Sequence, residues 1–277
     1  TTYSVGAMSM PEFLTHPFMQ RALLSGLLLS MLAGYYGVFV VQRRLSFLGA
    51  GLGHAAFGGI ALGLFLGVQP LWIAIPYTVV VAAGISWVKN HTRLSGDTAI
   101  GVFFSISVAL GIVFLSLESG RNADAFSYLF GSILAVSYTD IWVSAGLFCV
   151  GMLTIFTHWG AWAYASFDEE AANIEGLATK RQDTLLTTLI ALTIVLSIKV
   201  VGILLVAAWI VLPAAGARLI SPTFRIMTIV SIGLAAGSTV VGLYLSYALD
   251  LPSGAVIVLV QAGVFLVAMT LQSRVEN

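Results

Sequence analysis

The sequence predicts an all-α, polytopic membrane protein with eight or nine transmembrane helices. Three observations predict this fold: 59% of the 277 residues are hydrophobic, only 9% are charged, and the mean hydropathy is +1.00. A soluble domain carries roughly 25% charged residues, so this chain lacks the polar side chains that would cover a water-facing surface. The net charge of zero excludes a nucleic-acid-binding protein, which needs a basic excess, and the single cysteine excludes a disulfide framework.

The charged residues are confined to short clusters between long apolar segments. No Asp, Glu, Lys or Arg occurs in 22–42, 45–88, 98–117, 141–167 or 226–249. A helix needs about 20 apolar residues to cross the hydrocarbon core, and these segments lack the alternation of a barrel strand. We therefore expect crossings at 19–42, 46–67, 70–89, 98–117, 140–160, 224–248 and 254–273.

Three further segments complete the predicted organisation. Segment 184–217 accommodates one crossing followed by a second crossing or a re-entrant half-helix, with Gly202 as the expected break. Segment 123–136 is apolar but short, which favours a partial or surface-lying helix. Residues 1–10 lack the basic region and cleavage site of a signal peptide, so they are either a native tail or a remnant of added sequence. The whole chain, 1–277, is expected to form one transmembrane domain.

The basic residues predict the orientation, because Lys and Arg accumulate in short cytoplasmic loops. One side of the predicted bundle receives nine of them: Arg43, Arg44, Lys89, Arg93, Lys180, Arg181, Arg218, Arg225 and Arg274. The other side receives Arg21, Arg121 and Lys199. Lys199 is expected to snorkel to the outer interface, with a gating role as the alternative. The nine residues are therefore assigned to the cytoplasm and the N-terminus to the outside.

The second predicted span carries a candidate metal ligand. Its segment 48–63 (LGAGLGHAAFGGIALG) is so rich in glycine that neighbouring helices must enclose it closely. His54 lies inside this span, and ionisable groups within membrane helices commonly mark a substrate path. Neutral imidazole binds zinc and related divalent ions. The alternative is a packing histidine that is bonded to a neighbouring carbonyl or hydroxyl group.

The remaining histidines and the cysteine carry weaker signals. His16, His91 and His158 lie near the predicted span ends, where interfacial or surface roles are expected. Cys149 lies in an apolar span and is expected to be a small packing residue. Asp97 is expected to cap the helix that follows it.

The longest polar segment, 166–183 (SFDEEAANIEGLATKRQD), predicts a short helix on the cytoplasmic surface. Asp168 suits the N-cap, Glu169 and Glu170 are favoured by the helix dipole, and Gly176 suits a stop. Ordered loops of this length are commonly functional, so a docking element for a partner is favoured over a solvated connection. The sequence has no P-loop, H-E-x-x-H or G-x-S-x-G motif. If ATP drives this protein, another chain supplies the ATPase.

Six collinear segments resemble the membrane permease subunits of the zinc/manganese/iron family of ATP-binding-cassette importers. They are VVQRRLSFLGAGLGHAAFGGIALG (40–63), GDTAIGVFFSISVALG (96–111), SYLFGSILAVS (127–137), FDEEAANIEGLATKRQD (167–183), VVGILLVAAWIVLPAAGARLI (200–220) and LDLPSGAVIVLV (249–260). The resemblance implies a transport subunit of the bacterial inner membrane that is not itself an enzyme. It also implies a homodimer, cytoplasmic ATPase subunits, an extracytoplasmic metal-binding protein, and a zinc, manganese or iron ion as cargo.

The resemblance also assigns roles to individual residues. Segment 167–183 resembles the coupling helix that enters the ATPase, and its motif residues are Asp168, Glu169, Glu170, Ala171, Ala172 and Gly176. His54 matches the histidine of the family's pathway, whereas the acidic partner four residues earlier is replaced here by Ala50. The outward charges Glu118, Arg121, Asp124 and Asp250 either meet the binding protein or have no role.

Other functions stay open at this point. One is an importer permease for a metal chelate or another small cargo. A second is a secondary ion transporter that needs no ATP, although such proteins usually keep carboxylates within the membrane. A third is a structural membrane protein.

Overall fold

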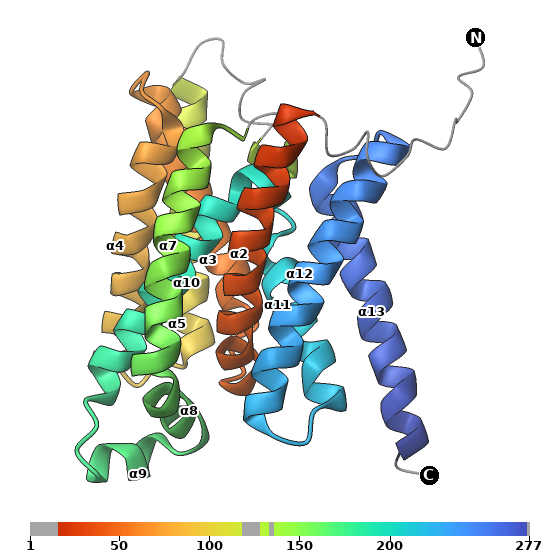
Figure 1. Ribbon diagram of the computed structural model, residues 1–277. Coiled ribbons are helices and arrows are strands. Elements are labelled where there is room, and N and C mark those ends of the chain that lie inside the picture. Colours follow the sequence, from red (N-terminus) through yellow and green to blue (C-terminus); the bar gives the residue numbers. More distant parts are fainter. Residues whose placement is uncertain (1–15, 118–127, 133–135, 276–277) are drawn as a thin grey trace.

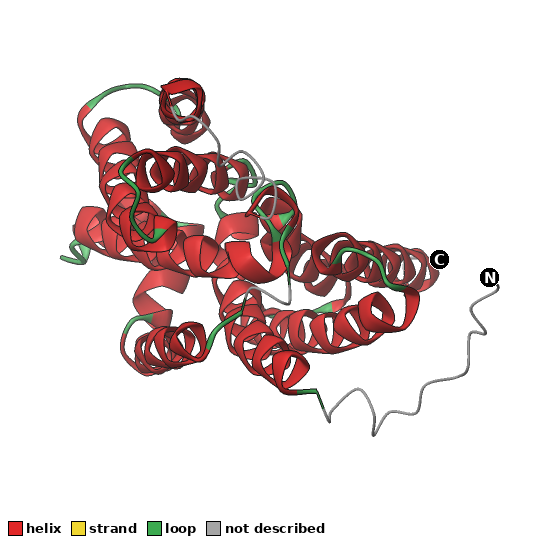
Figure 2. Ribbon diagram, turned by 90° about the horizontal axis from the view of Figure 1, so that it is seen from above, coloured by secondary structure: helices red, strands yellow, loops and turns green. Residues whose placement is uncertain are grey.

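The computed structural model describes residues 16–117, 128–132 and 136–275, and these residues form helices without any strand. Figures 1 and 2 show the helices packed side by side in one bundle. Within the described residues, eight helices are long and apolar enough to cross a membrane: α2 (Pro17–Gln42), α3 (Leu48–Phe65), α4 (Pro70–His91), α5 (Gly96–Leu117), α7 (Tyr138–Thr157), α10 (Thr179–Val201), α12 (Phe224–Leu249) and α13 (Ser253–Val275). The predicted all-α membrane fold is therefore confirmed.

The expected break at Gly202 is confirmed. Helix α10 ends at Val201, and the shorter α11 (Val206–Ile220) follows after four residues. Gly202 has φ 89°, and a Cβ atom built on it would lie 2.6 Å from the carbonyl oxygen of Leu129. Only glycine fits this backbone approach without strain. The described residues thus contain eight helices that are long enough to cross a membrane. The helix after the break, α11, is shorter, with 15 residues.

Helix ends differ from the predictions at two places. The expected span 140–160 is interrupted at His158: α7 ends at Thr157, and a separate helix α8 (Trp159–Phe167) follows it. Asp97 lies in the first turn of α5 and does not cap it; the hydroxyl of Ser95 instead accepts the backbone N–H of Thr98. Ser95 takes this position because its side chain precedes the first free amide groups of the helix.

The expected helix at 123–136 falls largely outside the described residues. Of this segment the structure describes a helical turn at 128–130, the loop residues 131 and 132, and residue 136. Glu118, Arg121 and Asp124 also lie outside the described residues.

The described basic residues that belong to or follow α2, and those that begin α10, lie at two opposite faces as predicted. Arg43 and Arg44 follow α2, and Lys180 and Arg181 lie in the first turn of α10, at the end of the bundle that holds α8 and α9 (Glu169–Ile174). We call this end the α9 face (Figure 1). Arg21 lies near the opposite face, in the first turns of α2. Which face is cytoplasmic stays a prediction.

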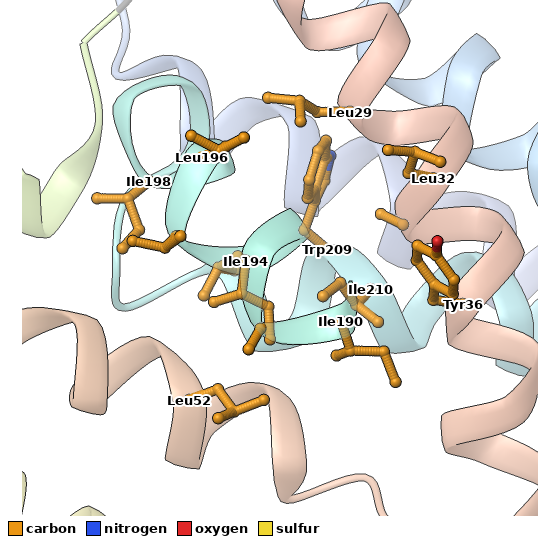
Figure 3. Close-up of a cluster of buried hydrophobic side chains, with 14 of the residues drawn as sticks. Leu29, Leu32, Tyr36, Leu52, Ile190, Ile194, Leu196, Ile198, Trp209 and Ile210 are labelled. Atoms are coloured by element: carbon orange, nitrogen blue, oxygen red, sulfur yellow. The ribbon is translucent and has the colours of Figure 1, made fainter. Parts of the chain in front are cut away.

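The core is centred on α2, α3 and α10. In their apolar windows 72%, 72% and 78% of the residues are buried, against 17% in α5 and 22% in α7. Figure 3 shows the centre: Ile190 and Ile194 of α10 lie among side chains from α2, α3 and α11, with Trp209 fully buried. The α5 and α7 surfaces are consequently available to lipid or to another chain.

The glycines of α3 serve close packing against three helices. A Cβ at Gly59 would lie 2.7 Å from the Ala74 Cα of α4, and one at Gly49 would lie 2.9 Å from the Ala207 Cα of α11. A Cβ at Gly51 would collide with the Ile100 side chain of α5. This confirms the predicted enclosure of segment 48–63 by neighbouring helices.

Two side chains lie elsewhere than predicted. Lys199 does not snorkel: its side chain is 8% exposed and its Nζ lies 2.8 Å from an oxygen of Asp140. The pairing occurs because α7 places a carboxylate beside the lysine, so its charge has a partner without reaching solvent. Cys149 is exposed on α7 rather than packed, because α7 lies at the edge of the bundle.

Candidate functional site

The first candidate site is the segment between α8 and α10, residues 168–178, which we call the α9 turn. Asp168 caps α9, because its carboxylate accepts the backbone N–H of Ala171 at 2.8 Å, and Glu169 and Glu170 occupy the first turn. Gly176 has φ 86° and reverses the chain after α9. The predicted cap, first turn and stop are therefore confirmed. The carboxylates of the α9 turn point to solvent, as a docking surface for another chain requires.

An aromatic cluster anchors this turn to the membrane helices. Trp162 of α8 is fully buried and lies edge-on to Phe39 of α2, with 5.7 Å between ring centroids. Phe39 also contacts Phe224 at the start of α12, and Phe167 at the end of α8 contacts the same Phe224 ring. Aromatic pairs of this kind favour fixed edge-to-face geometry. The α9 turn is thus attached to α2 and α12 through packed rings.

Charged side chains form a second attachment. Arg43, directly after α2, donates from Nη1 to Asp183 Oδ1 at 2.6 Å and from Nε to Ser166 Oγ at 2.8 Å. Lys89, in the last turn of α4, donates to the same Asp183 oxygen at 3.1 Å. The Asp183 side chain is only 7% exposed. The start of α10 is therefore joined by ion pairs to the ends of α2 and α4.

The charge of Arg43 persists in this environment. Burial lowers the pKa of its guanidinium below the ordinary value, while the carboxylates of Asp183 and Glu169 raise it. Because guanidinium groups stay protonated at neutral pH, Arg43 remains a cation. A cavity of about 400 Å³ opens beside this cluster and includes Thr179 and Gly96 among its lining residues.

The second candidate site is His54 on α3. Its Nδ1 lies 2.9 Å from the carbonyl oxygen of Ala50, and its ring contacts Phe104 of α5 with 4.7 Å between centroids. A carbonyl oxygen only accepts, so this bond places a proton on Nδ1. In the neutral ring, Nε2 then keeps the lone pair that binds a metal ion. Among the described residues, however, no three His, Cys, Asp or Glu side chains gather as a metal site.

The opposite face carries a third feature. Asp140 accepts from Lys199 with both oxygens, at 2.9 and 2.8 Å, and also caps the start of α7 together with Ser137. A cavity of about 670 Å³ lies on this face, lined by residues that include Phe130, Tyr247 and Asp250. Asp250, predicted to face outward, is the C-cap of α12 and is exposed.

The predicted site residues thus lie in two separate places. Asp168, Glu169, Glu170, Ala171, Ala172 and Gly176 are together in the α9 turn. His54 lies on α3 without any of them. Sequence analysis missed the Arg43–Asp183–Lys89 cluster, although it had placed Arg43 and Lys89 on one side and counted Asp183 in the polar segment. It also missed Trp162, whose burial no local pattern indicated.

Comparisons with known proteins agree over most of the chain. A sequence profile of the "ABC 3 transport family" matches residues 15–272. The manganese import system permease protein ScaB of Streptococcus gordonii is 34% identical over 91% of this chain and 90% of the relative. The high-affinity zinc uptake system membrane protein ZnuB of Haemophilus influenzae is also 34% identical, over 91% of this chain and 97% of the relative.

A solved structure has the same fold. PsaBC from Streptococcus pneumoniae in complex with Fab contains a chain that is 31% identical, with a TM-score of 0.82 over 94% of this chain and 93% of that chain.

Proposed function

The chain belongs to the ABC 3 transport family, and from this premise we propose that it is the permease subunit of an ATP-driven importer for divalent manganese or zinc ions. The observation that carries the proposal is the match to manganese and zinc permeases over nine-tenths of the chain. Permeases of this family are transport subunits rather than enzymes, so a separate chain hydrolyses ATP. The equal identity to a manganese and a zinc permease leaves both metals in the proposal.

The proposed assembly has two copies of this chain side by side in the inner membrane. The α9 face lies in the cytoplasm, because it holds most of the basic residues. There each copy docks one ATPase subunit through the α9 turn. The opposite face receives the metal ion from an extracytoplasmic binding protein, and the N-terminus lies on that side.

His54 is the proposed transient ligand of the ion. The bond from Nδ1–H to the Ala50 carbonyl supports this role, because in the neutral ring it leaves Nε2 as the nitrogen that can bind a metal ion. A second His54 from the other copy, with carbonyl groups and water, would complete the coordination shell. A weak site suits transport, because an ion that is held tightly would not leave.

The α9 turn is the proposed coupling element. ATP binding closes the ATPase pair and displaces α9, and the ring cluster and ion pairs transmit the displacement to α2, α4 and α12. The bundle then opens toward the binding protein and closes again when hydrolysis resets the ATPases.

Metal accumulation in cells tests this function. A strain without its own manganese and zinc importers would express this chain with its ATPase and binding protein, and uptake of radioactive Mn²⁺ and Zn²⁺ would be measured. We expect accumulation of at least one ion, and background uptake when an ATPase without hydrolytic activity replaces the active one. Unchanged uptake with the inactive ATPase would contradict the proposal.

Co-purification tests the coupling residues separately. Glu170→Lys and Gly176→Ala change the exposed charge and the reversed turn of the α9 segment, respectively. We expect both to reduce the amount of ATPase that purifies with this chain. Lys180→Gln serves as a control, because Lys180 is exposed in the same segment but lies outside the motif residues 168–176. Undiminished association of both variants would remove the coupling role.

A further inference from the structure

Asp183 differs from every other carboxylate of segment 166–183. Asp168, Glu169, Glu170 and Glu175 are exposed, whereas Asp183 is 5% exposed and lies one turn inside α10. The exposed groups suit contact with another chain. The buried one has its partners inside this chain, so its role lies in the bundle itself.

One guanidinium group binds residues on both sides of the α9 turn. Arg43 Nε bonds Ser166, before α9, and Arg43 Nη1 bonds Asp183, after it. Since Arg43 directly follows α2, any displacement of Ser166 and Asp183 relative to α2 must either move α2 or break these bonds. The chain turns sharply directly after Arg43, since the next residue, Arg44, has φ 58°.

Two cations share one carboxylate oxygen. Lys89 Nζ and Arg43 Nη1 both contact Oδ1 of Asp183, at 3.1 and 2.6 Å, from the ends of α4 and α2. A shift of α10 relative to α2 or α4 would therefore change these two contacts. Contiguous ion-pair networks of this kind can carry coupling between distant sites.

From these contacts we propose that Asp183 and Arg43 form the joint that transmits displacement of the α9 turn to α2 and, through Lys89, to α4. The inference rests on the proposed function, because it assumes that a partner moves α9. In this proposal Asp183 and Arg43 are positioning residues, which act through the helices and not on the transported ion. Loss of the Arg43–Asp183 pair should leave ATP hydrolysis intact and reduce the metal transport that is coupled to it.

The experiment uses liposomes that contain the complete complex with ATPase and binding protein. Metal ions taken up per ATP hydrolysed are compared for wild type, Arg43→Gln and Asp183→Asn. We expect the ratio to fall by about fivefold or more in both variants. Arg44→Gln is the matched control, because it removes the same charge one residue later from an exposed position, and its ratio should equal that of wild type.

A double variant separates transmission from folding. A single substitution disturbs a buried charge pair and can prevent folding, whereas Arg43→Met combined with Asp183→Leu removes both charges of the pair and leaves only Lys89, whose side chain is 26% exposed and can reach water. We expect this double variant to assemble with the ATPase and to remain uncoupled. If the double variant takes up as many metal ions per ATP hydrolysed as wild type, the proposed joint is wrong, because the pair would then only stabilise the fold. No ATP-driven uptake by the wild-type complex would instead overturn the proposed function.

Discussion

His54 is oriented by one contact within α3 and one with α5. Its Nδ1–H is bonded to Ala50 in the preceding turn, and the ring packs against Phe104. The sequence indicated this residue because it is an ionisable group inside an apolar span. The hydrogen bond could not be predicted, because it depends on the side-chain rotamer. The same bond occurs in a histidine that only packs, and the two roles differ in their effect on metal uptake.

Substitution of His54 tests its role in the pathway. His54→Ala should reduce metal uptake by about tenfold or more, because the ring supplies the only ionisable ligand of α3. Uptake of radioactive Mn²⁺ or Zn²⁺ at equal amounts of membrane protein measures the effect. His91→Ala, at the exposed end of α4, is the control. Wild-type uptake by His54→Ala would show that the histidine only packs.

Single glycines set how closely the helices approach. A Cβ at Gly254 would collide with the carbonyl oxygen of Val201, whereas no atom lies within 4 Å of one at Gly263 in the same helix. Gly254→Ala should therefore destabilise the protein by about 1–3 kcal/mol, as overpacking does. Gly263→Ala should leave it unchanged or slightly more stable. Thermal unfolding of the purified protein measures both, and equal melting temperatures would contradict the packing at Gly254.

At the scale of helices, apolar length predicted the spans well, because a crossing has a fixed minimum length. Observed ends such as Pro17 and Leu249 lie within two residues of the predictions. The division between α7 and α8 was missed, since 141–167 is apolar throughout and no charge marks the turn at His158. The burial of Lys199 was missed for a different reason: its partner Asp140 is distant in sequence and lies on another helix.

The Asp140–Lys199 pair joins α7 to α10 near the break at Gly202. Lys199→Met should destabilise the protein by about 1–3 kcal/mol, because it leaves the Asp140 carboxylate, which is only 13% exposed, without its cation. Adding Asp140→Asn should restore most of the loss, since asparagine can still cap α7. Unfolding curves of the single and double variants in detergent measure this coupling. If the unfolding curve of Lys199→Met coincides with that of wild type, the ion pair does not contribute to the stability of the fold.

At the scale of the whole molecule, charge and apolar surface are distributed in the manner of a membrane subunit with a soluble partner. Its exposed carboxylates are concentrated in the α9 turn, its basic residues gather at the same face, and the α5 and α7 surfaces are largely unburied. The sequence predicted these features because they follow from local composition. It could not predict how the α9 turn is fastened to the bundle, since Trp162, Arg43 and Asp183 meet only in the folded chain.

Reconstituted transport tests the central claim most directly. Liposomes that contain this chain alone, or with its ATPase and binding protein, would receive Mn²⁺ or Zn²⁺ outside and ATP on the side of the ATPase. The account predicts accumulation against a gradient only with the complete complex and hydrolysable ATP. Ion accumulation by this chain alone, driven by a proton or sodium gradient, would contradict it.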